Sequence, residues 1–498
     1  MLTPLDFIVI GTYLVGIAAF GVLTSGKQTS TTDYFLGGRD LPWWAVSFSV
    51  VATETSTLTV IGVPAVTYGG SFTFLQITIG YIIGRVIVAA FFLPRYFKGS
   101  MSTAYEFLGQ RFGDAMRATA AGTFMITRLL ADGVRLFATA IPLRVIAVSM
   151  GYDEVSYGLI IAVIAIITVA YTLVGGIRAV VWMDAIQMGL YVGGGIVAAI
   201  LLLGDVPTTW WADAGEAGKL ALFDFGFGES LSAWLTTPYV FWTAVLGGGI
   251  FAMASHGTDH LIVQRLLTCR DEADAKKALI ASGFLVMLQF ALFLFVGLLL
   301  WAHYGGVSPA DLGLANGNEI FPRYLIEGLP PGLSGLILAG IIAAAMSTLS
   351  SSLNSLASSS LFDLYERLGG RPLSQEQSLR LSRVLTLVWG LVFIGSALLF
   401  TDYTGPVVEL GLSIASFTYG GLLGIFLLGL LNARPNQQDG IIAFLVSIVL
   451  LFVIVKGVWY SPADGWMLQL MMSGSPEGYS PIGWPVCNLR RFISRNRK

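Results

Sequence analysis

Apolar residues occur in long blocks along this chain, and short polar segments separate the blocks. A helix needs about 20 apolar residues to cross the hydrocarbon core of a bilayer. The pattern therefore predicts about thirteen membrane-spanning helices, near residues 5–25, 43–68, 73–97, 117–149, 154–174, 181–204, 238–264, 278–303, 333–361, 382–401, 405–431, 439–459 and 463–473. We expect an all-α polytopic membrane protein, in which residues 1–498 form a single transmembrane domain.

Two of the predicted spans contain polar residues and glycines, which favour a broken helix. They are SVVATETSTLTVIGVP, from Ser49 to Pro64, and LGGGIFAMASHGTDHLIVQR, from Leu246 to Arg265. Glycine tolerates unwound backbone, and the freed carbonyl groups become ligands for a cation. Alternatively, the small residues let neighbouring helices pack closely. Each segment opens a group of five spans, so we interpret residues 43–204 and 238–431 as inverted repeats of a transporter core.

The composition excludes a soluble domain, because 55% of the residues are hydrophobic and only 12% are charged. Charged residues make up about a quarter of soluble domains. The net charge of −2 gives no indication of a nucleic-acid partner. The first apolar run, near Phe7–Leu23, lacks a basic flank and a cleavage site, so we expect a retained helix rather than a signal peptide. The lipid bilayer is the expected surrounding.

Basic residues separate the two sides of the predicted membrane. One side holds Arg95, Lys98, Arg111, Arg117, Arg265, Arg270, Lys276, Lys277, Arg367, Arg371, Arg380, Arg383 and the tail RRFISRNRK. The opposite loops hold mainly Lys219 and Arg323, among several acidic residues. The positive-inside rule then predicts an outer N-terminus and a cytoplasmic C-terminus in the cell (inner) membrane. Cys269 and Cys487 both fall on the cytoplasmic side, so we expect no disulfide.

One predicted helix carries an unusual number of hydroxyl groups, in the segment MSTLSSSLNSLASSS from Met346 to Ser360. At 100° per residue, four of them spread over about 160° of the helix, and Ala344 lies inside that arc: Ser347, Thr348, Ser350 and Ser351. Hydroxyl and carbonyl oxygens suit a hard cation. Alternatively, each hydroxyl bonds back to a carbonyl one turn earlier on a packing face. That alternative fits Ser355 and residues 358–360.

Several motifs resemble those of the sodium:solute symporter family. STTDYFLGGRDLPWWAVSFSVVATETS resembles its amino-terminal signature, and GGIRAVVWMDAIQ (Gly175–Gln187) resembles its most specific internal motif. IVQRLLTCRDEADAKKA and AGIIAAAMSTLSSSLNSLASSSLFDLY are similar to its seventh and ninth spans. The similarity runs from about residue 5 to residue 431. STAYEFLGQRF and GVPAVTYG look closest to the branch that carries vitamins, monocarboxylates and iodide, and the sialic-acid and sugar branches look more distant.

The resemblance implies Na⁺ sites between the second, sixth and ninth spans. The ligands implied for the first ion are the carbonyl groups of Ala52, Thr55 and Ala344 with the hydroxyls of Ser347 and Thr348. Those implied for a second ion are Asp184, Ser347, Ser350 and Ser351. An aspartate within an apolar span is a functional candidate. The alternative is that Asp184 pairs with nearby Arg178.

The resemblance also implies a solute site beside the broken helices. The matching positions are Glu54, Ser56, Thr59, Gln76, Met253 and His256. A buried carboxylate needs a partner, so Glu54 is expected to meet a cationic solute group, a sodium ion or an arginine. His256 is expected to be a packing or gate residue or, alternatively, a proton carrier.

The fourth span offers arginine partners for an acid. Arg128, Asp132 and Arg135 follow an i, i+4, i+7 spacing and share one helix face. One arginine can pair with Asp132, which leaves the other for Glu54 or for a solute carboxylate. A bidentate arginine–carboxylate contact would favour an acidic solute. A purely structural charge network is the alternative. We expect Arg85 to snorkel towards a membrane face.

The sequence thus predicts a sodium-coupled secondary active symporter. It would import a small organic solute, expected to carry a carboxylate, by alternating access with one or two Na⁺. A proton-coupled carrier of the same fold and a transporter-like solute sensor are the alternatives. Three scattered histidines and two distant cysteines give no catalytic arrangement, so we expect no enzyme. The expected partners are the solute and Na⁺, and no obligate protein partner is evident.

Overall fold

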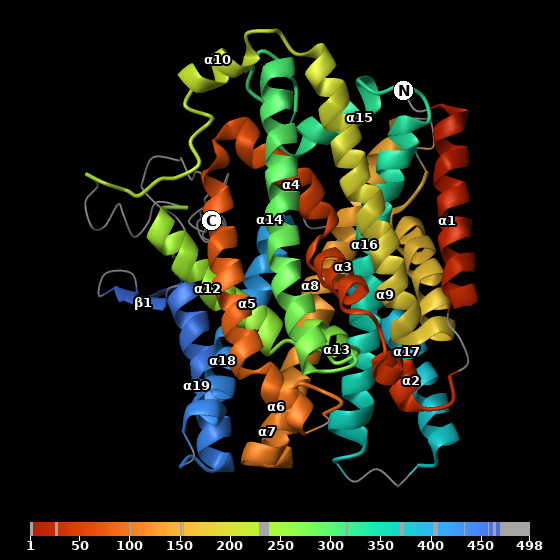
Figure 1. Cartoon of the computed structure of the whole chain (residues 1–498), viewed down its shortest axis with the longest axis vertical. Coiled ribbons are helices and arrows are strands. Elements are labelled where there is room, and N and C mark those ends of the chain that lie inside the picture. The colour runs from red at the N-terminus through yellow and green to blue at the C-terminus, as the bar shows by residue number, and fades with distance from the viewer. Residues whose placement is uncertain are drawn as a thin grey trace, which may run out of the picture.

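The computed structural model describes residues 3–24, 28–99, 101–149, 152, 154–228, 239–314, 317–368, 373–401, 407–432, 434–456, 458–461 and 465–468. It is a bundle of long helices (Figure 1). The long helices are α1 (Pro4–Thr24), α5 (Gln76–Phe91), α8 (Asp114–Ser149), α9 (Tyr157–Asp205), α14 (Glu272–His303), α16 (Leu333–Ser359), α17 (Gln375–Leu398), α18 (Val407–Leu431) and α19 (Gln437–Lys456).

Shorter helices connect or interrupt the long ones. Two pairs lie end to end: α3 (Trp43–Glu54) with α4 (Thr57–Gly69), and α12 (Phe241–Gly257) with α13 (His260–Leu266). The others are α2 (Thr31–Leu36), α6 (Leu93–Lys98), α7 (Tyr105–Phe112), α10 (Trp210–Glu216), α15 (Ile320–Glu327), the 3₁₀ turns η1 (Gly37–Arg39), η2 (Phe72–Leu75) and η3 (Gly317–Glu319), and the π-helical turn η4 (Ser360–Tyr365).

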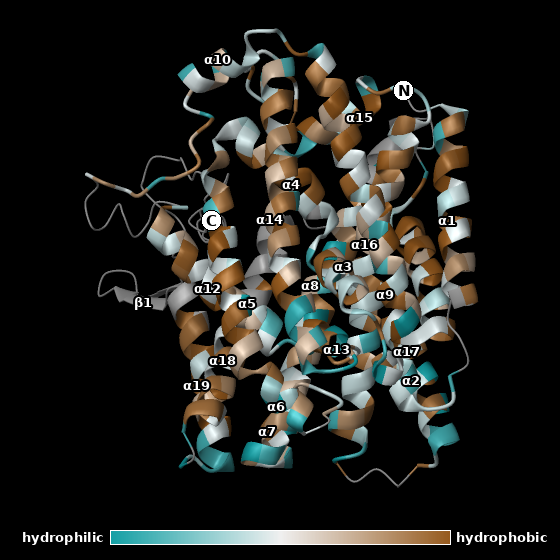
Figure 2. Ribbon diagram, in the orientation of Figure 1, coloured by the Kyte–Doolittle hydropathy of each residue, from teal (hydrophilic) through white to brown (hydrophobic). Residues whose placement is uncertain are grey.

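Six described helices are long and apolar enough to cross a membrane, and the bent pair α3–α4 makes a seventh. Figure 2 shows hydrophobic residues along the outer helices and a patch of hydrophilic residues inside the bundle, near α3, α8 and α13. The all-helical, polytopic fold class is therefore confirmed. The total of about thirteen spans and the inverted repeat stay predictions.

The predicted last span, near residues 463–473, is wrong where the structure describes it. Residues Gly465–Leu468 form β2, which pairs antiparallel with β1 (Val458–Ser461). Eleven helical residues would span only about 16 Å, roughly half of the hydrocarbon thickness. Residues 469–473 and Cys487 lie outside the described residues.

Helix α9 holds two predicted spans and reverses its direction between them. The Tyr171 hydroxyl donates to the Met346 carbonyl (3.2 Å), and Asp184 accepts from Ser347 (2.6 Å). Residues thirteen positions apart in a straight helix would be about 20 Å apart, yet these contact adjacent residues of α16. The turn falls at Gly176, whose φ of 55° and ψ of −159° are non-helical.

The glycines of the second broken span do not unwind the helix. Gly247, Gly248 and Gly249 lie within the regular helix α12, and the break comes later, at residues 258–259. A Cβ on Gly248 would lie 2.6 Å from the Ile77 carbonyl oxygen, and one on Gly80 would lie 2.3 Å from the Val245 carbonyl oxygen. These glycines therefore allow α5 and α12 to pack backbone to backbone, which is the alternative that the sequence left open.

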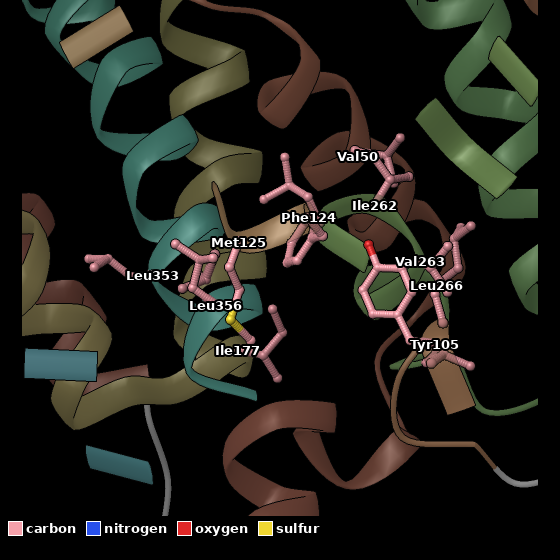
Figure 3. Close-up of a cluster of buried hydrophobic side chains, with 14 of the residues drawn as sticks. Val50, Tyr105, Phe124, Met125, Ile177, Ile262, Val263, Leu266, Leu353 and Leu356 are labelled. Carbon is pink, nitrogen blue, oxygen red and sulfur yellow. The ribbon is translucent and has the colours of Figure 1, made fainter. Parts of the chain in front are cut away.

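Two groups of helices emerge from the packing. In one group, α3, α4, α5 and α12 pack with α14 or with one another; in the other, α8, α9, α16, α17 and α18 pack together. Helix α3 also packs against α9 and α16, so it lies at the boundary. Figure 3 shows part of the hydrophobic core beside this boundary, where Val50, Tyr105, Phe124, Ile262 and Leu356 come from five different helices. The packed hydrophobic side chains on these helices therefore fix the positions of the polar groups at the boundary.

Candidate functional site

The first broken helix interrupts its hydrogen bonding at the centre of the bundle. Helix α3 ends at Glu54, and both Thr55 and Ser56 adopt extended backbone conformations before α4 begins. Thr59 and Ser56 form a capping box at the start of α4. The last backbone bond of α3 joins Thr55 N to the Val51 carbonyl (3.0 Å). The carbonyl groups of residues 52–55 therefore lack a helical partner, as the prediction of a break requires, and the Ser56 carbonyl accepts the first bonds of α4.

The residues implied for the first sodium site meet at the boundary between α3 and α16. Two contacts join this boundary: the Thr53 hydroxyl lies 3.2 Å from the Ser351 hydroxyl, and the Thr57 hydroxyl donates to the Ile341 carbonyl (3.3 Å). Four of the residues implied for the site lie between these contacts along the chain, and the fifth, Ala52, directly precedes Thr53. All five are buried: Ala52, Thr55, Ala344, Ser347 and Thr348. In this conformation the Ser347 hydroxyl donates to Asp184 (2.6 Å) and the Thr348 hydroxyl donates to the Ala344 carbonyl (3.2 Å). Carbonyl and hydroxyl oxygens are donors that suit Na⁺, but these hydroxyls would have to turn towards an ion.

The place implied for a second sodium ion holds an arginine. Arg265, from α13, donates through Nε to the Ser49 hydroxyl (2.9 Å), pairs with the Asp184 carboxylate (3.3 Å) and contacts the Ser351 hydroxyl. Asp184 also accepts from Ser49 (2.5 Å) and Ser347 (2.6 Å). All of these side chains are fully buried. The guanidinium therefore supplies the positive charge next to Asp184 in this conformation.

Two expectations about this region need correction. The alternative pairing of Asp184 with Arg178 is wrong, because Arg178 pairs with Asp40 instead. Arg265 is not a loop cation, because its side chain is fully buried in the bundle. The sequence predicts Arg265 at the end of a broken helix, but it does not indicate that Asp184, which is 81 positions away, is its partner. Ser350 donates to the Ser347 carbonyl (3.0 Å), as expected for a packing hydroxyl.

Glu54 has an arginine partner, but not one from the fourth span. Arg85 Nη2 lies 2.5 and 2.6 Å from the two Glu54 carboxylate oxygens, and its Nη1 donates to the Ser282 hydroxyl (2.8 Å). His256 Nε2 also contacts the Glu54 carboxylate. Arg85 is fully buried, so the expectation that it snorkels is wrong. Glu54 is thereby held by α5, α12 and α14 and already carries a counter-charge.

The arginines of the fourth span differ in their surroundings. Arg128 contacts Asp259 and the Tyr419 hydroxyl, lies 3.6 Å from Asp132, and has a side chain only 5% exposed. Arg135 donates a single bond to Asp132 (3.1 Å), and 24% of its side chain is exposed. Arg128 therefore belongs to a buried network of charged and hydroxyl groups that includes Asp259 at the start of α13. Arg135 keeps donors available.

A cavity of about 10 Å³, with room for about one water molecule, adjoins the break in the first broken helix. It is lined by Ser56, Thr57, Asp132, Arg135, Leu136, Thr139, Ala345, Thr348 and Leu349. One cavity thus connects Arg135, the polar start of α4 and a residue implied for the first sodium site. Of the residues implied for the solute site, the structure brings Ser56 and Arg135 to this cavity.

The other residues implied for the solute site lie elsewhere. Gln76 donates to the Tyr239 carbonyl (2.7 Å) and accepts from the Asp224 amide (3.2 Å), so it secures a loop. Met253 packs against the hydrophobic core. Gln289, near the break, exchanges hydrogen bonds with the Thr55 hydroxyl (2.9 and 3.1 Å).

A broken helix that faces a hydroxyl-rich helix across two packed groups is typical of a secondary transporter. The sequence profile of the sodium:solute symporter family matches residues 34–447. The chain belongs to the sodium:solute symporter family, and it is a sodium-coupled symporter integral to a membrane.

Similar proteins include both acid carriers and structures of the same fold. The sodium/sialic acid symporter NanT of Aliivibrio fischeri is 32% identical over 89% of this chain and 86% of its own length. The sodium-coupled monocarboxylate transporter 2 of Bos taurus is 28% identical over 96% of this chain and 78% of its own. The structure of a substrate-bound, outward-open Na⁺-coupled sialic acid symporter superposes with a TM-score of 0.77 at 25% identity, covering 94% of this chain and 99% of that one. These identities do not support the expectation that the sialic-acid branch is the more distant.

Proposed function

We propose that this symporter imports a small solute with a carboxylate group and that Arg135 binds this group. The observation that carries the proposal is the position of Arg135 in the cavity at the break, where its one hydrogen bond among the described residues goes to Asp132. The cavity would have to widen to admit a solute, as a conformational change between the helix groups would allow. A carboxylate could accept two parallel bonds from its guanidinium. Ser56 and Thr57 would hydrogen-bond the polar part of the solute. The relatives named for sialic acid and for monocarboxylates support an acidic solute.

We infer that one sodium ion binds between the freed carbonyls of α3 and the hydroxyls of α16. Such an ion would connect the two groups of helices next to the solute cavity. A ligand shifts conformations only by its differential affinity for them, so separation of α3 from α16 would release the ion. A second ion at Asp184 would require Arg265 to withdraw.

The gradient provides enough free energy for concentration of the solute. One sodium ion gains about 2.3 kcal/mol from a potential of 100 mV and about 1.4 kcal/mol from a tenfold gradient. Together these allow accumulation of a neutral solute by a factor of several hundred. The direction of import assumes an outer N-terminus and a cytoplasmic C-terminus in the cell membrane, as the distribution of basic residues indicates.

Thermal unfolding of the purified protein tests the proposed function. We would add N-acetylneuraminate, pyruvate, lactate or neutral glucose, in sodium or in equimolar choline. A ligand that binds the folded protein raises its unfolding temperature. We expect an acid to do so only in sodium, with apparent affinity at least about tenfold weaker in Arg135→Gln.

Arg144→Gln is the matched control, because Arg144 donates to the Val155 carbonyl and lies over the Tyr157 ring. Equal stabilisation in choline would contradict sodium coupling. Unchanged acid binding by Arg135→Gln would contradict the role of Arg135.

A further inference from the structure

Lys219 lies where the segment after α10 meets the carboxy-terminal end of α4. Its Nζ donates to three backbone carbonyls, those of Thr67 (3.3 Å), Tyr68 (2.8 Å) and Gly70 (3.1 Å). Only 8% of the residue is exposed. An ammonium group has three donors, and here each one has a carbonyl partner.

Two of these carbonyls are among those that a helix leaves unpaired at its end. The last backbone bond of α4 joins Gly70 N to the Val66 carbonyl (2.8 Å). The carbonyls of Thr67 and Tyr68 therefore have no partner within the helix. A cation at this end also complements the negative pole of the helix dipole. Lys219 thus acts as a cap for α4 that is supplied from about 150 residues further along the chain.

The same lysine connects α4 to α14. Its ammonium group lies 5.0 Å from the centre of the Trp301 ring, on α14, close enough for a cation–π interaction. The Tyr68 hydroxyl donates to the Val307 carbonyl (2.6 Å), just beyond α14. A Cβ on Gly297 of α14 would lie 2.1 Å from the Pro64 carbonyl oxygen. Lys219 therefore completes a close junction between the two helices.

We propose that Lys219 is a positioning residue that clamps the end of α4 to α14. The opposite end of α4 carries Ser56 and Thr57, which line the solute cavity. Helix α4 is continuous over 13 residues, or about 20 Å, although Pro64 removes one of its internal hydrogen bonds. A shift at one end is therefore expected to reach the other end. The effect of Lys219 on solute binding rests on the proposed function, whereas the contact between Lys219 and α4 does not.

Hydrogen–deuterium exchange in sodium at pH 7 tests the clamp in the full chain. Burial lowers the pKa of Lys219 to about 8, so the group is protonated under these conditions. We expect Lys219→Met, which keeps the length of the side chain but not its charge, to accelerate exchange of residues 60–69 about tenfold, because local opening is governed by local contacts. Lys219→Arg should restore protection. Lys276→Met removes a partly exposed ion pair with Glu272 at the start of α14 and should leave α4 unchanged.

Two binding measurements separate positioning from general stability. In Lys219→Met we expect the sodium concentration for half-maximal thermal stabilisation to stay within about twofold, because the sodium ligands lie on α3 and α16. The apparent affinity for N-acetylneuraminate or pyruvate, whichever stabilises the parent protein, should fall about tenfold.

Unchanged exchange of α4 in Lys219→Met would overturn the clamp, and so would an equal acceleration in every helix. Unchanged affinity for the acid, with α4 loosened, would overturn the effect on the solute cavity. If sodium failed to stabilise the parent protein, the proposed function would fail, and the exchange of α4 would still decide the clamp.

Discussion

At the buried pair of Asp184 and Arg265, an arginine side chain occupies the position next to the carboxylate that a sodium ion would take. A carboxylate surrounded by hydroxyls is a site for a cation, and here a guanidinium takes the place of that cation. Removal of one partner from a buried ion pair costs about 3–5 kcal/mol, because the other charge stays buried without compensation. Sodium could provide that compensation only if the space is accessible to it.

Arg265→Gln should therefore make the stability of the protein more dependent on sodium. In choline we expect a large fall in the unfolding temperature, and in sodium a partial recovery that exceeds the sodium effect on the parent protein. The double variant Asp184→Asn/Arg265→Gln removes both charges and should lose the extra sodium response. Identical sodium responses in Arg265→Gln and the parent protein would show that no second ion can replace the arginine.

At the scale of the helices, the adjacent glycines Gly247 and Gly248 of α12 differ in whether they contact another helix. Gly248 faces the Ile77 carbonyl oxygen, which a Cβ would approach to 2.6 Å, whereas a Cβ on Gly247 would meet nothing within 4 Å. Gly248→Ala should separate α12 from α5 and lower the free energy of unfolding by about 1–3 kcal/mol. Gly247→Ala should instead raise it by up to about 1 kcal/mol, because alanine favours the helix.

Unfolding of both variants in mixed detergent micelles, monitored by circular dichroism, measures the difference. Equal effects of the two substitutions would mean that the close contact between α5 and α12 does not contribute to stability.

The helices were predictable from the sequence to the extent that local pattern determines them. Apolar blocks located the spans, and the acid and hydroxyl groups of residues 53–57 located the first break correctly. The second break falls within the predicted segment, from Leu246 to Arg265, but at residues 258–259 and not at its three glycines. Three glycines indicate either unwinding or close packing, and the partner helix decides between them. Asp259, the N-cap of α13, was the better signal, since its side chain accepts from the Leu261 amide (2.9 Å).

The sequence shows the oxygen donors of the candidate site but not its charge pairs. The hydroxyls of α16 lie in one segment, so their pattern is visible locally. Arg85 and Glu54 are 31 positions apart, and Arg265 and Asp184 are 81 apart. Such pairs depend on which faces of distant helices meet, which spacing within one helix does not reveal.

At the scale of the molecule, we expect the boundary between the two helix groups to open and close during transport. The implied sodium ligands, the solute cavity and the Thr57–Thr139 contact all lie along it. Thr57 is on α4 and Thr139 is on α8, and their hydroxyl oxygens are 3.2 Å apart. Alternating access requires these helices to separate and approach in each cycle, whereas a rigid binding protein would leave them fixed.

A disulfide across this contact should therefore stop transport without stopping folding. We expect Thr57→Cys/Thr139→Cys to lose at least about tenfold of its sodium-driven uptake in proteoliposomes after oxidation, and to regain it with a reductant, because bridged cysteines hold their Cα atoms within about 7 Å. Each single-cysteine variant, treated in the same way, controls for loss of the threonine hydroxyl. The native Cys269 is fully buried, and Cys487 is replaced by serine in the parent protein and in every variant so that it does not compete. If mass spectrometry demonstrates the bridge and uptake continues at its full rate, then α4 and α8 do not separate during transport, and the boundary that opens must lie elsewhere.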